Sequence, residues 1–181
     1  MLKTLTLEVP KHIKKFYENG EYGPANAKEH IQVSRWSELG KLLHLVSRTI
    51  PVTQKVRVIE GSKITFAYNL REKAYEIPYD KIPDLTRQLE EIFRRSLITY
   101  VGACQMKTGA DSYAEFIREF LDFYDIIPDV DCDWEVLRKI YRDHLERIEK
   151  SNSLRRTKPE DRPMIRKNSE KSSAQKVRKN A

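Results

Sequence analysis

The sequence predicts an α+β fold, in which about five helices pack on a small antiparallel sheet and a disordered basic C-terminal tail follows. Apolar residues alternate with a period of two near the N-terminus and again between 55 and 78, as they do in half-buried strands. Between and after these segments the apolar residues recur at helical spacing. From about Lys150 onward large apolar residues are rare, so this part of the chain buries too little surface to order itself. We therefore expect a single domain over 1–149 and a disordered tail over 150–181.

A strand and a helix open the predicted domain. Residues 3–9 alternate so that Leu7 and Val9 share one face with the other apolar side chains of the strand. Pro10 ends this strand. Because proline is well tolerated in the first turn of a helix, we expect a helix over 11–19.

A loop over 20–33 and a second helix are predicted next. Ser34 is a candidate N-cap for this helix, because a serine side chain can accept a hydrogen bond from the backbone of the first turn. The apolar stripe that we expect to be buried consists of Trp36, Leu39, Leu42, Leu43 and Val46.

Residues 55–78 predict a three-stranded antiparallel meander. Turn residues at 60–62 and 69–72 separate three short segments, each with the alternating pattern of a strand. The alternating apolar residues are Val56 and Val58, then Ile64, Phe66 and Tyr68, then Tyr75 and Ile77.

Three longer helices complete the predicted domain. The first follows Pro78 and is expected to end near Gly102. The second covers 112–124 and opens on a Ser-x-x-Glu sequence, which has the spacing of a capping box. The third covers 132–149 and ends where the periodic pattern fades.

The sequence carries no motif of a catalytic or cofactor site. None of its six glycines lies in a phosphate-binding loop, and the motifs of zinc proteases and serine hydrolases are missing. We therefore expect a non-enzymatic protein with no catalytic residue, no cofactor and no metal. The histidines, which lack the spacing of metal ligands, are His12, His30, His44 and His144.

Cysteine use and hydropathy indicate a cytoplasmic protein. Cys104 and Cys132 lie in predicted helices without a CxxC spacing, so we expect buried, reduced thiols. No stretch approaches the roughly 20 apolar residues of a membrane span, and the start of the chain lacks a signal-peptide core. We expect no membrane partner.

Five acidic residues gather before the last helix, and they have two interpretations. Carboxylate oxygens suit magnesium or calcium, and a metal-dependent nuclease is one use of such a site. However, the run lacks the glycine turn and the closing glutamate of an EF-hand loop, and no second carboxylate cluster is visible. We favour capping of the last helix, which would then start after Asp131 or Asp133. The run consists of Asp125, Asp129, Asp131, Asp133 and Glu135.

Aromatic residues are concentrated in the last two predicted helices. Bases stack on exposed aromatic rings, so these residues are candidates for a single-strand binding site. Most of them share a stripe with Ile117 and Leu137, which favours a position in the core, and only Phe123 lies off the stripe. The residues are Tyr113, Phe116, Phe120, Phe123, Tyr124, Trp134 and Tyr141.

The positive charge is concentrated in the tail. The chain has a net charge of +7, to which residues 150–181 contribute +8 and residues 1–149 contribute −1. A basic segment binds nucleic acid by displacing condensed counterions, although such segments also bind membranes or acidic proteins. The candidate residues of the tail are Lys150, Arg155, Arg156, Lys158, Arg162, Arg166, Lys167, Lys171, Lys176, Arg178 and Lys179.

Two arrangements in the domain are candidates for reading DNA. The strand at 3–9 followed by two helices has the order of a ribbon-helix-helix module, but Glu8 on its outward face repels phosphate. The helices over 112–124 and 132–149 have the order of a helix-turn-helix, although their connection exceeds the usual three or four residues. The outward basic residues of the last helix are Arg138, Lys139, Arg142 and Arg147, interleaved with Asp143, Glu146 and Glu149.

Four segments of the chain resemble small uncharacterised proteins encoded by bacterial phages and mobile elements. The segments are 7–16, 36–43 with its Leu39-Gly40 pair, 120–126 and 137–147. The resemblance covers roughly 1–148 and excludes the tail. It implies a genome-associated accessory protein of a bacterial cell, such as a regulator. The resemblance implies no particular activity for this chain.

The charge distribution and the resemblance together predict a nucleic-acid-binding accessory or regulatory protein, with DNA favoured over RNA. In this interpretation the tail supplies electrostatic affinity, and the last helix fixes the position of the protein along the nucleic acid. The alternative is a protein-protein adaptor or structural component whose near-neutral domain carries the binding face. Sequence specificity and oligomeric state stay open.

Overall fold

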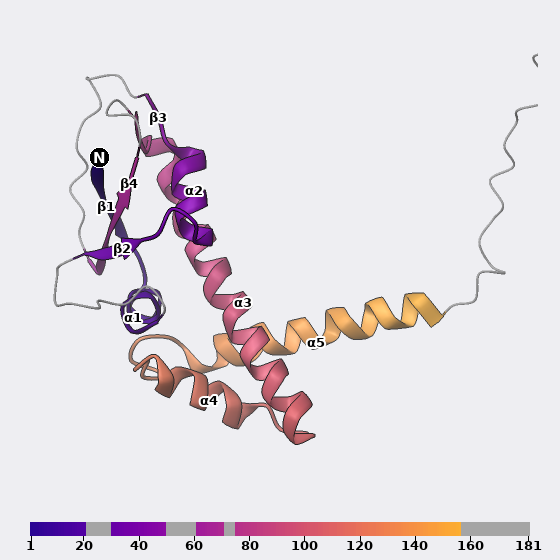
Figure 1. Cartoon of the computed structure of the whole chain (residues 1–181). Helices are drawn as coiled ribbons and strands as arrows, with labels where there is room; N and C mark the ends of the chain where they lie inside the picture. The colour runs from indigo at the N-terminus through magenta and orange to yellow at the C-terminus, as the bar shows by residue number, and fades with distance from the viewer. Residues whose placement is uncertain (21–29, 50–60, 71–74, 157–181) are drawn as a thin grey trace, which may run out of the picture. The chain divides into compact units, whose positions relative to one another are not determined.

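The computed structural model confirms an α+β fold (Figure 1). It describes residues 1–20, 30–49, 61–70 and 75–156. The chain forms two compact units, Met1–His144 and Leu145–Ala181. The elements of the first unit are β1 (Leu2–Glu8), α1 (Lys11–Asn19), β2 (Ile31–Val33), α2 (Glu38–Val46), β3 (Arg48–Thr49), β4 (Lys63–Asn69), β5 (Tyr75–Glu76), the 3-10 turn η1 (Tyr79–Lys81), α3 (Ile82–Thr108), α4 (Ala114–Phe123) and the start of α5 (Trp134–Arg156).

The main sheet is mixed, whereas the sequence predicted a purely antiparallel sheet. Its strand order is β1-β4-β2, with β1 antiparallel and β2 parallel to the central strand β4. The strand β2 lies inside the segment 20–33, which was predicted as a loop. Ile31 and Val33 are buried on one face of this strand. Three residues are too few for a periodic signal, and parallel pairing to β4 depends on contacts distant in sequence.

The predicted meander is wrong among the described residues. Strand β4 pairs with β1 and β2, while β5 pairs with β3 in a separate two-stranded sheet. The predicted strand around Val56 and Val58 lies outside the described residues. Alternation along the chain predicted the strands themselves but carried no information about their partners.

Three helix boundaries differ from the prediction because capping residues were misassigned. Helix α2 is capped by Ser37, whose Oγ accepts a hydrogen bond from Gly40 N at 3.0 Å, so Ser34 lies outside the helix. Helix α3 continues through Gly102 and ends at Gly109, which adopts a left-handed backbone with φ of 67°. Helix α4 begins after Tyr113 without a side-chain cap, so the predicted capping box does not form.

The core of the first unit joins the sheet to the helices through aromatic side chains. Tyr17 of α1 meets Phe66 of β4 with ring centroids 5.8 Å apart, and Phe16 meets Phe93 of α3 at 5.3 Å. Helix α3 contacts β1, α1 and α4 in turn, and Figure 1 shows it running from the sheet to α4. This long helix therefore ties the sheet and the helical half into one unit.

The second unit contains the C-terminal part of α5, which stays helical to Arg156. The sequence predicted disorder from position 150, so the segment 150–156 corrects that boundary. Intrinsic helix propensity explains the extension, because leucine, arginine and lysine are good helix formers. The predicted disorder of 157–181 lies outside the described residues. No helix within the described part of the chain is both long and apolar enough to cross a bilayer.

Candidate nucleic-acid interface

The predicted binding residues are divided between the two units of the structure. Arg138, Lys139 and Arg142 lie on α5 in the first unit, and Arg147 and Lys150 lie on α5 in the second. Arg155 and Arg156 belong to the last turn of this helix. The remaining candidates lie outside the described residues: Lys158, Arg162, Arg166, Lys167, Lys171, Lys176, Arg178 and Lys179.

Neighbouring acids neutralise part of the basic face of α5. Arg138 Nη1 lies 2.8 Å from Glu135 Oε1, and Lys150 Nζ lies 3.9 Å from Glu146 Oε2. These pairs are spaced three and four residues apart, as expected for a solvated helix surface. Lys139 and Arg142 are exposed and form no ion pair with any described residue. These two cations are therefore the residues of α5 best placed to contact a phosphate.

The start of α5 confirms the capping interpretation of the acidic run. Asp133 Oδ1 accepts hydrogen bonds from Glu135 N at 2.7 Å and from Val136 N at 3.3 Å. Asp129 Oδ1 accepts a third from Trp134 N at 3.2 Å. These bonds satisfy backbone donors that have no partner inside the helix.

A second acidic residue of the run fastens the α4–α5 loop to α1. Asp131 Oδ2 accepts hydrogen bonds from Lys15 Nζ at 2.7 Å and from Ile127 N at 2.8 Å. Burial alone would raise the pKa of Asp131, but these two donors lower it below its ordinary value. The hydrogen bond to Asp131 also raises the pKa of Lys15. Among the described residues, no group of three histidine, cysteine or acidic side chains is arranged to hold a metal.

The only thiol near this loop is not a nucleophile. Cys132 and His12 line a small cavity of about 190 Å³ between α1, α3 and α5. Burial, together with the negative charges of the flanking aspartates, raises the pKa of Cys132 to about 11. The thiolate is the reactive form, so this cysteine is protonated and inert at neutral pH. Both Cys104 and Cys132 are free and half-buried, whereas the sequence predicted buried thiols.

A groove of about 940 Å³ runs along β1 in the first unit. Strand β5, the turn η1 and the first half of α3 form its other walls. Four of its five charged side chains form ion pairs within the unit, and Glu8 forms none with a described residue. The ion pairs are Lys3 with Glu76 at 3.3 Å, Arg87 with Asp84 at 3.0 Å and Glu90 with Arg94 at 2.6 Å. A groove whose charges are mixed and mostly compensated does not attract a polyanion.

The ribbon-helix-helix interpretation is wrong in its central feature. In that module β1 pairs with the same strand of a second chain, but here it pairs with β4 of its own chain over its full length. Its outward residue Thr6 forms a hydrogen bond with Thr65 of β4, with the two Oγ1 atoms 3.0 Å apart. Strand β1 is therefore an edge strand of the chain's own sheet, and Thr4 and Glu8 of its outward face are exposed.

Of the seven aromatic residues of the last helices, three are buried in the core as predicted, three are half-buried and one is exposed. Phe116, Phe120 and Tyr141 are buried, and Phe123 is exposed. Trp36 contradicts the prediction, because 80% of its surface is exposed although it was assigned to the buried stripe of α2. The Ser-x-x-Ser spacing at 34–37 allows a cap at either serine, and the second choice moves Trp36 out of the helix.

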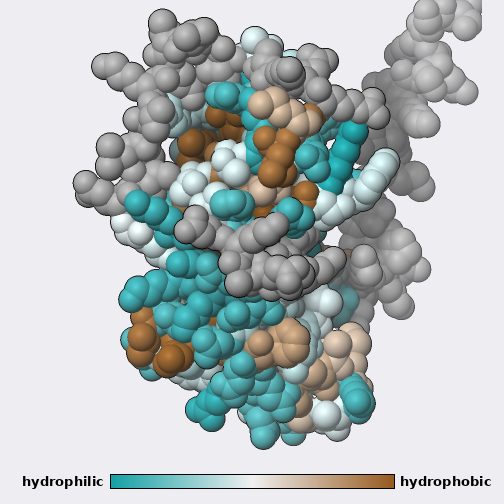
Figure 2. Space-filling model, turned by 60° about the vertical axis from the view of Figure 1, so that its left-hand side comes forward, coloured by the Kyte–Doolittle hydropathy of each residue, from teal (hydrophilic) through white to brown (hydrophobic). Residues whose placement is uncertain are grey.

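On the face shown in Figure 2, hydrophobic residues form separate spots between hydrophilic ones. Two of the exposed apolar residues, Ile127 and Val130, lie in one turn of the α4–α5 loop, where Val130 N donates to Ile127 O at 3.3 Å. Such small apolar spots are common on protein surfaces.

The chain matches no known protein family, no curated protein and no solved structure. Its function therefore has to be argued from its own residues.

Proposed function

We propose that this protein is a non-enzymatic nucleic-acid-binding accessory or regulatory protein of a phage or mobile element. Its basic C-terminal segment supplies the electrostatic affinity for phosphates. The exposed residues Lys139 and Arg142 add contacts that orient the helix α5 on the nucleic acid. DNA is the favoured partner, and the protein acts in the cytoplasm of a bacterial cell.

The observation that carries this proposal is the separation of charge between the two compact units. Residues 1–144 contain equal numbers of acidic and basic residues and have no net charge. Residues 145–181 carry the entire excess of +7. A segment with this density of cations gains binding free energy by releasing the counterions condensed on a nucleic acid.

The helical extension of α5 to Arg156 gives the proposal its geometry. Within the second unit the helix carries Arg147, Lys150, Arg155 and Arg156, so cations follow one another along a single element. Phosphate contacts from such an element fix position and orientation without reading sequence. We therefore expect binding with weak sequence preference.

Binding to labelled 20-nucleotide DNA, single-stranded and duplex, tests this function. The full chain is compared by fluorescence anisotropy with a chain that ends at Arg156, which keeps all of α5. A second variant replaces the eight lysines and arginines of 157–181 with glutamine, so that length is unchanged. We expect both variants to bind at least tenfold more weakly at 50 mM salt. If no form binds at this salt concentration, the proposed function is wrong.

A protein-protein adaptor is the second candidate, and the exposed apolar turn of the α4–α5 loop favours it. Ile127 and Val130 are 50% and 63% exposed. The turn is held firmly, because Ile127 N and Asp131 N both form hydrogen bonds within it, the latter to Ile127 O at 2.9 Å. A rigid apolar turn is a usual element of protein interfaces. Retained partner binding by the chain that ends at Arg156, with no nucleic-acid affinity in the full chain, would favour this candidate.

A further inference from the structure

The most exposed aromatic ring of the described residues belongs to Trp36, which lies just before α2. Its surface is 80% exposed, and no aromatic ring or cation of the described residues lies against it. The other tryptophan, Trp134, is half-buried, and the guanidinium carbon of Arg118 lies 5.2 Å from the centre of its ring. Exposing a tryptophan forfeits the free energy of burying its large apolar surface, so the local structure that enforces this exposure needs an explanation.

A closely bonded turn holds Trp36 outside the core. Ser37 N and Ser37 Oγ both donate to Ser34 O, at 3.1 Å and 2.7 Å. Trp36 N donates to Ser34 Oγ at 3.3 Å. The turn also requires Gly40, because a Cβ atom there would lie 2.0 Å from Ser34 O. Trp36 is therefore presented on a fixed backbone, and little conformational entropy is lost when its ring is covered.

In many helices an apolar side chain at the fourth helical position covers the residue before the N-cap, but α2 has Lys41 at that position. With Ser37 as N-cap, Trp36 occupies the position before the cap and Lys41 the fourth helical position. In many helices an apolar pair at these two positions forms a hydrophobic staple. Here the pair is a tryptophan and a lysine, both exposed, so no apolar side chain covers the ring from this position.

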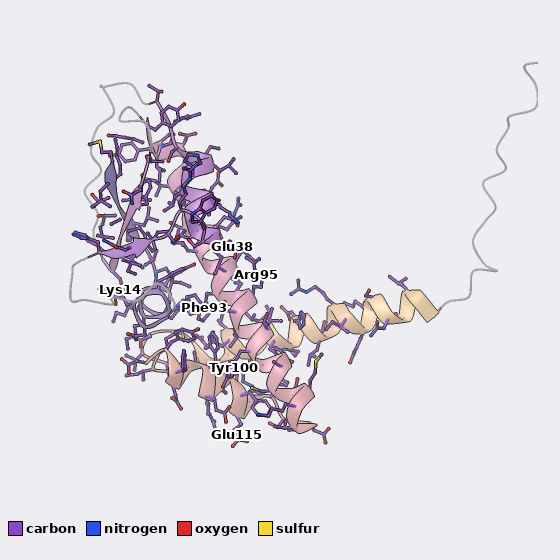
Figure 3. All side chains as sticks on the ribbon, in the orientation of Figure 1. Lys14, Glu38, Phe93, Arg95, Tyr100 and Glu115 are labelled. Carbon is purple, nitrogen blue, oxygen red and sulfur yellow. The ribbon has the colours of Figure 1, made fainter. Side chains whose placement is uncertain are left out.

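Basic residues outnumber acids around this turn. Arg35 precedes Trp36 and Lys41 follows it, and neither forms an ion pair with a described residue. The single acid of the first turn, Glu38, is bound to Arg95 of α3, with Nη2 and Oε1 2.8 Å apart. Figure 3 shows Glu38 and Arg95 side by side between the two helices. Near Trp36 in the sequence, two cations, Arg35 and Lys41, are therefore free of ion pairs with described residues, whereas the acid Glu38 is paired.

We propose that Arg35, Trp36 and Lys41, the Trp36 surface, bind single-stranded nucleic acid by stacking one unpaired base on the indole ring. Stacking on an exposed ring together with cations for the flanking phosphates is the usual design of single-strand sites. In a duplex the faces of the bases are already stacked, so the surface selects unpaired strands. This inference rests on the proposed function and adds a substrate class to it.

Tryptophan fluorescence tests the inference directly. The full chain, the Trp36→Phe variant and the Trp36→Ala variant are titrated with unlabelled (dT)12 and with a 12-base-pair duplex. The fluorescence of the full chain minus that of Trp36→Phe is the contribution of Trp36. We expect (dT)12 to quench this contribution and the duplex to leave it unchanged. We also expect Trp36→Ala to bind (dT)12 about fivefold or more weakly, with unchanged affinity for the duplex.

Leu45→Ala is the matched control, because Leu45 lies on α2, the helix that follows Trp36, and is 81% exposed. This variant should bind (dT)12 as the full chain does, and circular dichroism should show that every variant is folded. Binding of (dT)12 without quenching, and with equal affinity in Trp36→Ala, would overturn the inference and leave the proposed function standing. In that case Trp36 would belong to a protein interface. Failure of the full chain to bind either DNA at 50 mM salt would instead reject the proposed function.

Discussion

Lys15 of α1 and Asp131 of the α4–α5 loop form an ion pair of 2.7 Å between residues 116 positions apart. Only 5% of the Asp131 side chain is exposed. Asn19 Nδ2 strengthens the same junction by donating to Tyr124 O at 2.8 Å. The loop that caps α5 is thus fixed to the first helix of the chain, which holds the start of α5 in place.

Replacing Asp131 with alanine should destabilise the first unit. The change leaves Ile127 N without its acceptor and removes the partner of Lys15. We expect thermal unfolding to occur roughly 2–4 °C lower, the shift produced by losing about one hydrogen bond in a domain of this size. Asp125→Asn is the control, because this side chain is 80% exposed and 3.8 Å from Lys15, and asparagine tolerates the left-handed φ of 54°. Equal losses in the two variants would contradict this assignment.

The stability of the protein should fall as the pH drops below about 6.5, because burial lowers the pKa of His12. Burial lowers the pKa of His12 below its ordinary 6.5, despite the hydrogen bond to Asp131 O and the nearby Glu90. Below pH 6.5 the unfolded chain therefore binds a proton more readily than the folded one, and stability is lost as the pH falls toward the folded pKa. The free energy of unfolding, measured in urea at several pH values, should change less with pH in His12→Gln than in the parent. An unchanged pH dependence of the unfolding free energy in His12→Gln would refute the role of His12.

Two glycine substitutions should change stability in opposite directions. Gly40→Ala places a Cβ atom 2.0 Å from Ser34 O and should cost about 1–3 kcal/mol. Gly102→Ala lies inside α3, where the nearest atom is Tyr141 Oη at 3.8 Å, and should stabilise by about 0.5–1 kcal/mol. Chemical denaturation measures both changes. A stable Gly40→Ala variant would show that the turn before α2 is not as close as described.

The paired and unpaired cations of α5 should contribute differently to nucleic-acid binding. The double variant Lys139→Ala/Arg142→Ala should make the slope of log K against log salt shallower by about one or two units, because each phosphate contact contributes roughly one unit. Arg138→Ala should change the slope little, since Glu135 already compensates this charge. Anisotropy titrations between 50 and 200 mM salt compare the variants. Equal effects of the two changes would mean that the ion pair with Glu135 does not restrain Arg138.

The sequence predicted the helical half of the fold well because its signals are local. The spacing of Ile13, Phe16 and Tyr17 in α1, and the capping of α5 by Asp133, depend on residues within a few positions of one another. The pairing of β2 with β4, in contrast, joins Ile31 to Phe66. No pattern within either segment specifies that partner, so the mixed sheet could not be predicted.

The candidate site was predicted only in part, for similar reasons. Composition was sufficient to locate the basic segment, but the ion pairs that neutralise Arg138 and Lys150 depend on helix geometry. Trp36 was missed because hydrophobicity alone assigns a tryptophan to the core. Its exposure follows from the choice between Ser34 and Ser37 as cap and from the close approach at Gly40.

The salt dependence of binding by the full chain tests the central claim most directly. The observed association constant for single-stranded DNA is measured between 50 and 200 mM salt, for the full chain and for the variant with a neutral 157–181. Contact of the basic segment with about six phosphates predicts a slope of log K against log salt of roughly −4 for the full chain and a much smaller one for the variant. Equal slopes for the two proteins, or a slope near zero for the full chain, would contradict the claim.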